Sequence, residues 1–248
     1  MKKFSLVIVC IFAGLFLSTK IMAQEKKVAL VSFYCDKKIG GTGMGTAGEN
    51  LMKDPRFDLK PTLDKAYVTF TTQFAKDFPF KLVDKATVTG NPAYQAYQSY
   101  FMADTSTNTG VKKLTATQYA IEDGFIWAEW CGTLVRDERI DEINLYKILK
   151  DNCDGTMFVH IDYEITPGFG GLSANVTAYF NMTLCDKTGK KVFTIREAGV
   201  SKKKVAAVGG IPIMSVEKIQ PLCEDATTVL FSELQDKINK IVKKSANF

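Results

Sequence analysis

Hydrophobic and polar residues alternate across the stretch from Met157 to Arg196. Between Asn175 and Cys185 every second residue is apolar: Val176, Ala178, Phe180, Met182 and Leu184. This period of two is typical of a strand with one buried and one polar face. Residues 158–165 alternate in the same way, and 192–196 follow a turn in which Gly189 can adopt a positive φ. The pattern predicts a three-stranded antiparallel meander at the centre of a sheet.

The first part of the chain predicts a β-α-β unit. Residues 26–35 form a β-branched and apolar run, as in a strand buried on both faces. Residues 61–78 are apolar at helical spacing, with Pro61 suited to the first turn and Pro79 ending the helix. The short strand expected at 80–84 should pair parallel to the first, through a right-handed crossover.

Further helices are expected from Asn91 onwards, at 137–153 and at 216–244. Residues 103–136 are rich in polar residues but also hold both tryptophans, and we interpret them as an insertion. The sequence therefore predicts one α/β (α+β) domain over residues 24–248. Its mixed sheet would combine the β-α-β unit and the meander, flanked by helices, with a long C-terminal helix.

The N-terminus resembles a secretory signal peptide. Lys2 and Lys3 precede an apolar run from Phe4 to Leu17, and cleavage is expected between Ala23 and Gln24. This run is shorter than the roughly 20 residues that span a bilayer, so we expect no stable membrane anchor. The expected location is the periplasm or outer envelope, or the medium after secretion. Removing residues 1–23 lowers the formal charge from +5 to +2, which weakens any indication of nucleic-acid binding.

The cysteines do not suggest a metal or cofactor site. The mature chain would hold five, with no Cys-x-x-Cys pair: Cys35, Cys131, Cys153, Cys185 and Cys223. We expect them to act mainly as small buried apolar residues, although export leaves a disulfide open. We predict no metal, no cofactor and no catalytic residue.

The glycine-rich segment 40–48 contains a literal G-x-G-x-x-G at Gly43, Gly45 and Gly48. A dinucleotide-binding loop would need a tight strand-turn-helix context, but these glycines start well after the strand and Pro55 limits any helix that follows. A mobile surface loop is the favoured interpretation.

Two candidate sites emerge. His160, the only histidine, shares one strand face with Asp162 and Glu164. Such a row could serve acid-base or metal chemistry, but neighbours on that face are about 6.5–7 Å apart, and no second histidine supports a metal site. The second candidate is a basic and then apolar loop at 197–215, expected to become ordered when it contacts a partner. Its contact residues would be Lys202, Lys203, Lys204, Val208, Ile211, Ile213 and Met214.

Several segments resemble a small α/β domain of bacterial envelope proteins. They are KKVALVSFY at 26–34, the helix at 61–78, FKLVD at 80–84, LCDKTGKKVF at 184–193 and the final helix. That domain occurs in the N-terminal part of the Tol-Pal β-propeller protein, in curli-secretion lipoproteins and in penicillin-binding-protein activator lipoproteins. The chain lacks their lipidated cysteine, so tethering and pore formation are not implied.

The resemblance implies a non-catalytic envelope module that binds other proteins. The alternative is a periplasmic small-ligand binder or hydrolase that uses the polar strand face around His160. The sequence leaves the partner's identity and the oligomeric state open.

Overall fold

A computed structural model of the 248-residue chain describes residues 25–41, 45–99, 118–132, 140–208, 211–245 and 248. The expected signal peptide at 1–23 lies outside the described residues. The strands are β1 (Lys27–Asp36), β2 (Lys81–Leu82), β3 (Tyr119–Ile121), β4 (Gly155–Pro167), β5 (Ser173–Asp186), β6 (Lys191–Val200), β7 (Val205–Val208) and β8 (Ile211–Pro212). The α-helices are α2 (Gly45–Lys53), α3 (Lys60–Thr69), α4 (Lys85–Thr89), α5 (Pro92–Gln95), α7 (Asp141–Leu149), α8 (Val216–Leu234) and α9 (Ile238–Lys244).

The strands form one mixed eight-stranded sheet. β1 lies parallel to both β2 and β4, which confirms the predicted β-α-β unit. β4, β5 and β6 are antiparallel neighbours, which confirms the meander. Gly189 in the β5–β6 turn has a φ of 77°, as that turn requires. The predicted α/β fold class is therefore correct, including the long helical segment at the C-terminus.

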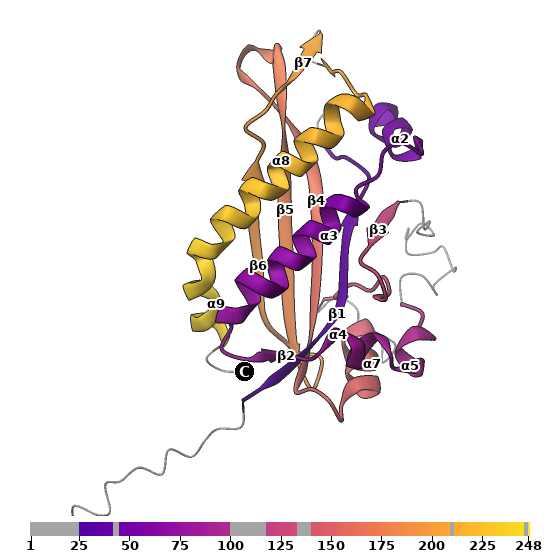
Figure 1. Ribbon diagram of the computed structural model, residues 1–248, viewed down its shortest axis with the longest axis vertical. Coiled ribbons are helices and arrows are strands. Elements are labelled where there is room, and N and C mark those ends of the chain that lie inside the picture. The colour runs from indigo at the N-terminus through magenta and orange to yellow at the C-terminus, as the bar shows by residue number, and fades with distance from the viewer. Residues whose placement is uncertain (1–24, 42–44, 100–117, 133–139, 209–210, 246–247) are drawn as a thin grey trace, which may run out of the picture.

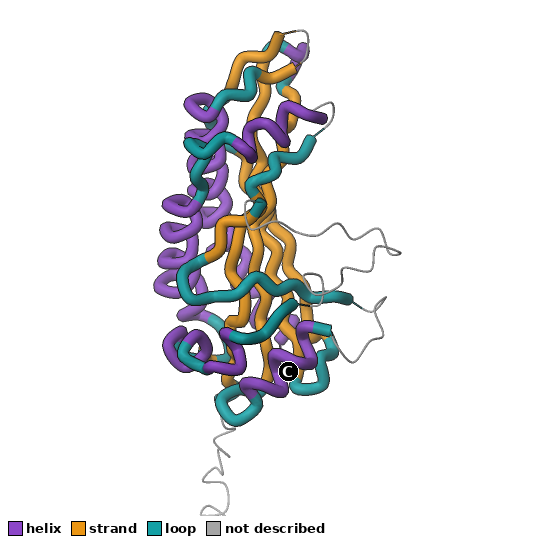
Figure 2. Tube along the Cα trace, turned by 90° about the vertical axis from the view of Figure 1, so that its right-hand side faces the viewer, coloured by secondary structure: helices purple, strands orange, loops and turns teal. Residues whose placement is uncertain are grey.

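Helices α3 and α8 run side by side across one face of the sheet (Figure 1). Viewed from the side, the long helices lie along one side of the strands (Figure 2). Phe180 at the middle of β5 is fully buried on this face, and its ring contacts those of Phe70, Phe74 and Phe231. The alternating apolar residues of β5 therefore form the centre of the core.

The predicted helix at 61–78 is present but is not α-helical throughout. After α3 the chain makes a π-helical turn at Phe70–Phe74, closed by the Ala75 N–H donating to the Phe70 carbonyl, and a 3-10 turn at Ala75–Asp77. Phe70, Phe74 and Phe78 are all buried against one another. These three rings join the crossover helix to the sheet.

Other predicted boundaries were wrong. The helix opened by Asn91 is a single turn, although Asn91 accepts the expected capping hydrogen bonds from the amides of Ala93 and Tyr94. Helix α7 ends at Leu149, before the expected end at residue 153, and β4 begins at Gly155. The closing helix has the predicted bounds, from Val216 to Lys244, although a 3-10 turn at Gln235–Lys237 interrupts it.

The described part of the predicted insertion is integrated into the sheet. β3 pairs antiparallel to the end of β1, on the side away from β4. The segment that follows packs on the sheet face opposite α3 and α8, where the Ser32 hydroxyl donates to the Ile126 carbonyl and accepts from the Ala128 amide, each at 3.2 Å. Phe125 and Trp127 are buried there.

All five cysteines of the described chain have free thiols, and all but Cys131 are buried. Burial raises the pKa of Cys153 to about 11, so its thiol stays protonated at neutral pH. Among the helices described, none has the length and apolar character needed to cross a membrane.

Candidate functional site

The predicted polar row lies on β4 and faces away from α3 and α8. His160 Nε2 lies 3.3 Å from Asp162 Oδ2, so the structure brings these two residues together. Glu164 is exposed one step further along the strand, where the backbone of Gly40 pairs beside it. The row therefore consists of a close pair and a separate exposed carboxylate.

An aromatic cluster that the sequence did not connect with His160 contacts it through Tyr34. The ring of Tyr34 on β1 stacks on His160, with centroids 5.4 Å apart and an interplanar angle of 16°. Tyr34 also contacts Tyr119 edge-to-face at 5.3 Å and Trp127 at 5.8 Å. These residues come from three separate segments, which only the sheet pairing brings together.

Carboxyl groups gather on the same side. Asp162 accepts a hydrogen bond of 2.9 Å from the side chain of Asn181, its neighbour on β5. Burial raises the pKa of Asp36, although the Lys38 amide and the Gln118 side chain donate to its carboxylate. Burial also raises the pKa of Glu129; nearby His160 lowers that pKa, and the charge of Asp162 raises it further.

Two kinds of catalytic arrangement are not found among the described residues around His160. No described residue supplies a hydroxyl or thiol that is hydrogen-bonded to His160, so the nucleophile and base pair of covalent catalysis is missing from this part of the chain. The described His, Cys, Asp and Glu side chains also form no group of three or more arranged to hold a metal ion. The cluster can offer a polar and aromatic contact surface.

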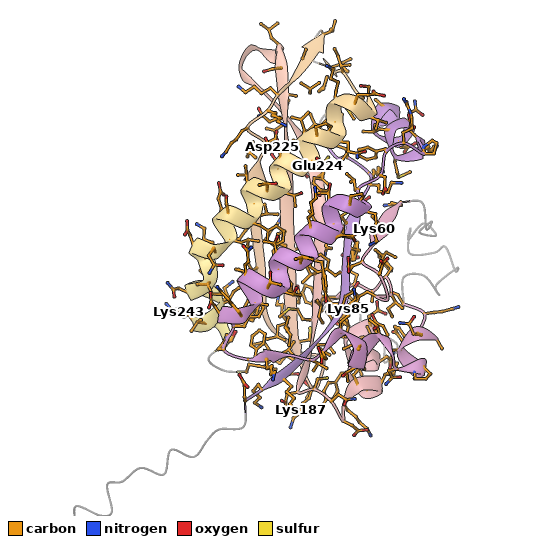
Figure 3. All side chains as sticks on the ribbon, viewed as in Figure 1. Lys60, Lys85, Lys187, Glu224, Asp225 and Lys243 are labelled. Atoms are coloured by element: carbon orange, nitrogen blue, oxygen red, sulfur yellow. The ribbon has the colours of Figure 1, made fainter. Side chains whose placement is uncertain are left out.

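The second candidate, at 197–215, is not the irregular loop that the sequence predicted. β6 continues to Val200, and β7 and β8 form a short hairpin, because β7 pairs with both β5 and β8. The Lys202 and Lys203 amides donate to Asp225 on α8, at 2.6 and 3.0 Å. Figure 3 labels Asp225 on the upper half of that helix. Hydrogen bonds thus hold the segment in place.

Most of the predicted contact residues are exposed. Lys202, Lys203 and Lys204 are exposed in the turn before β7. Val208, Ile211 and Ile213 are 73%, 60% and 44% exposed, and we name these three the hairpin patch. Met214 differs, because it is half-buried and packs against the core.

The two candidates share one face of the sheet. Asp162 is paired with Tyr179, and residues paired across neighbouring strands point to the same face. Ser173 lies an even number of residues before Tyr179 on β5 and pairs with Ala206 on β7. Because side chains alternate along a strand, Val208 points to this face as well. We call the part of this side that carries Asp162 and Tyr179, where the side chains are only partly buried, the open face.

Two of the clefts in the described part of the chain lie away from the polar row. One of about 480 Å³ lies between the end of the crossover helix and β2, with Tyr67, Phe80 and Lys85 in its lining. The other, of about 350 Å³, separates α3 from α8. Neither is lined by His160, so neither supports a ligand site at the polar row.

The glycine-rich segment also differs from its prediction. Helix α2 begins at Gly45, so a surface loop does not extend through Gly48. Gly40 is fixed beside β4 by hydrogen bonds of 2.8 Å to the backbone of Tyr163 and Ile165. Gly43 lies outside the described residues.

Comparisons with known proteins add no family. No protein-family model matches the chain, and no curated protein has a significantly similar sequence.

Proposed function

We propose that the protein is an exported, non-catalytic module of the bacterial cell envelope that binds another protein through the hairpin patch and the adjoining open face. The observation that carries this proposal is the exposure of three neighbouring aliphatic side chains on one face of a short hairpin. Val208 and Ile211 are paired across the hairpin, and Ile213 follows on the same side.

The hairpin patch has the chemistry of an interface core. Burying an exposed aliphatic side chain of this size contributes about 1–2 kcal/mol. Three such side chains together would supply a large share of the affinity of a modest complex. Apolar residues gathered at one place on a surface are typical of protein-binding sites.

The hydrogen bonds that hold the β7–β8 hairpin and the positive charge of the lysines before it support the same function. The Ala207 amide donates to the Leu172 carbonyl at 2.9 Å, and the Ile213 amide donates to the Ala206 carbonyl at 3.0 Å. A hairpin held in this way loses little conformational entropy on binding. The three exposed lysines before β7 would increase the association rate with an acidic partner.

The proposal of an envelope location rests on the signal-like N-terminus and on the resemblance to envelope α/β domains. Intact mass measurement of the exported protein tests the location, because cleavage should leave a chain that begins near Gln24. Recovery of uncleaved chain in the membrane fraction would contradict it.

Photocrosslinking tests the binding surface. Benzoylphenylalanine in place of Val208 should give a discrete covalent adduct with one partner in cells, and Ile211→Asp in the same chain should abolish the adduct. Val68 on α3 is the matched control position, because it is a valine that is 56% exposed on the opposite side of the sheet. Absence of an adduct from position 208, or the same adduct from both positions, would refute the proposal.

A further inference from the structure

β6 forms an outer edge of the sheet, with β5 on its other side. The Ser201 amide donates to the Val176 carbonyl at 2.8 Å, which fixes the hydrogen-bonding register of the pair. Backbone groups alternate in direction along an antiparallel strand. The N–H and C=O groups of Arg196, Ala198 and Val200 therefore point outward, and no described residue is hydrogen-bonded to them.

Contacts at both ends limit this unpaired stretch. Below it, the Lys244 ammonium donates to the outward carbonyl of Thr194 at 2.9 Å. Above it, β8 pairs with the outer side of β7, so a strand already occupies the next position outward there. Residues 196–200, which we call the β6 edge, are about 17 Å long at the usual rise of 3.4 Å per residue. This length suits a short added strand.

The surroundings of the β6 edge are basic. Lys202, Lys203 and Lys204 lie just beyond its upper end and form no ion pair with a described residue. Lys243, labelled in Figure 3, is exposed near the end of α9, beyond the lower end of the edge. Arg196 is exposed on the edge itself.

Two carboxylates that contact this region already accept hydrogen bonds from the chain itself. Glu197 accepts from the Lys240 ammonium at 2.7 Å. Asp225 accepts from the two lysine amides described above. Positive charge therefore remains available to a partner along the edge.

We propose that the β6 edge binds an extended, acidic segment of a partner protein as an added strand of the sheet. Main-chain hydrogen bonds to Ala198 and its neighbours would hold the segment, and its acidic side chains would meet the lysines at either end. The same positive charge disfavours pairing of two β6 edges from two copies of this chain. The inference rests on the proposed function for the existence of a partner, and adds the conformation and charge of the segment that binds.

A synthetic peptide in which glutamate alternates with valine is the probe. Fluorescence anisotropy should show binding that weakens as salt rises, and hydrogen exchange should slow at the Arg196 and Ala198 amides. A peptide with lysine in place of glutamate should bind at least about tenfold more weakly. A glutamate peptide with N-methylated valines should also lose binding, because it cannot complete the ladder.

Ala198→Pro is the decisive variant. The Ala198 N–H points away from β5, so proline there removes no existing ladder hydrogen bond but blocks an added strand. Binding should fall about tenfold or more, whereas Ala198→Ser, which keeps the N–H, should bind as the wild type does. If Ala198→Pro does not fold, the N-methylated peptide makes the same test on the wild-type chain.

Three results would overturn the inference: no binding of the glutamate peptide, equal binding of the lysine peptide, or unchanged binding by Ala198→Pro. Ile211→Asp separates this inference from the proposed function, because it alters the hairpin patch and leaves the β6 edge intact. If the peptide still binds the Ile211→Asp variant and no crosslink forms at Val208, only the role of the hairpin patch in binding is refuted. A crosslink at Val208 without peptide binding would remove only the strand-addition inference.

Discussion

Gly199 on β6 lies directly against the backbone of α8, and Gly199→Ala should push the helix and the strand apart. A methyl group on Gly199 would lie 2.3 Å from the Leu230 nitrogen, 2.5 Å from the Leu230 Cα and 2.7 Å from the Ala226 carbonyl oxygen. All three are backbone atoms of α8, so no side-chain rotation can relieve the overlap. Alanine at this position therefore requires the helix or the strand to move.

The expected loss follows from two opposing effects. Overpacking a core usually costs about 1–3 kcal/mol, and contact with backbone atoms places Gly199→Ala at the upper end. The substitution also reduces the conformational entropy of the unfolded chain, which stabilises the folded protein by about 0.4–1 kcal/mol. Gly199 does not have a positive φ, so backbone strain adds nothing. The net destabilisation should be about 2–3 kcal/mol.

Urea unfolding measures this loss. With a slope of about 2–3 kcal/mol per molar urea, the midpoint should fall by about 1 M while the slope stays unchanged. Gly40→Ala is the matched control, because its methyl group would lie 3.3 Å from the Cγ of the exposed Glu164 side chain and 3.6 Å from the Tyr163 carbonyl oxygen, with no backbone atom closer than that. The free energy of unfolding of this control should stay within about 0.5 kcal/mol of the wild-type value. Equal midpoints for Gly199→Ala and the wild type would refute the close packing of α8 on β6.

Other variants test the two faces of the sheet and the carboxyl cluster. Phe180→Ala should lower the free energy of unfolding by about 3–5 kcal/mol, because its buried ring packs against Phe70 and Phe231. His160→Ala should lower the free energy of unfolding by only about 0.5–1.5 kcal/mol, mainly because the ring stacking is lost. If urea melts show a larger loss for His160→Ala than for Phe180→Ala, the two faces of the sheet are misassigned. Glu129→Gln should stabilise the protein at pH 7, because the raised pKa of Glu129 makes the wild type lose stability as pH rises above the ordinary carboxyl pKa of about 4.3. In thermal melts this gain should disappear near pH 4, and an equal gain at pH 4 and pH 7 would contradict it.

The sequence alone determined the local structure wherever a regular period reports it. Val176, Phe180 and Leu184 were predicted to share the buried side of a strand, and all three are fully buried. Alternation identifies them because the pleat of a strand fixes which side chains share a face, whatever the strand pairs with. The crossover helix was similarly evident, although its π-helical turn at Phe70–Phe74 leaves no clear mark on the spacing.

Only the tertiary structure decided which residues meet across the sheet. Trp127 lay in a segment with no clean period, yet the pairing of β3 with β1 brings that segment against Tyr34, whose ring stacks on His160. The hairpin at 205–212 was missed because its glycines and proline predicted a loop, whereas the protruding end of β5 provides hydrogen-bonding partners for β7. Periodicity describes a segment's own faces, but the outward edge of β6 and the basic groups around it arise from contacts between residues far apart in the chain. Pairing and packing settle such contacts, and no single segment encodes them.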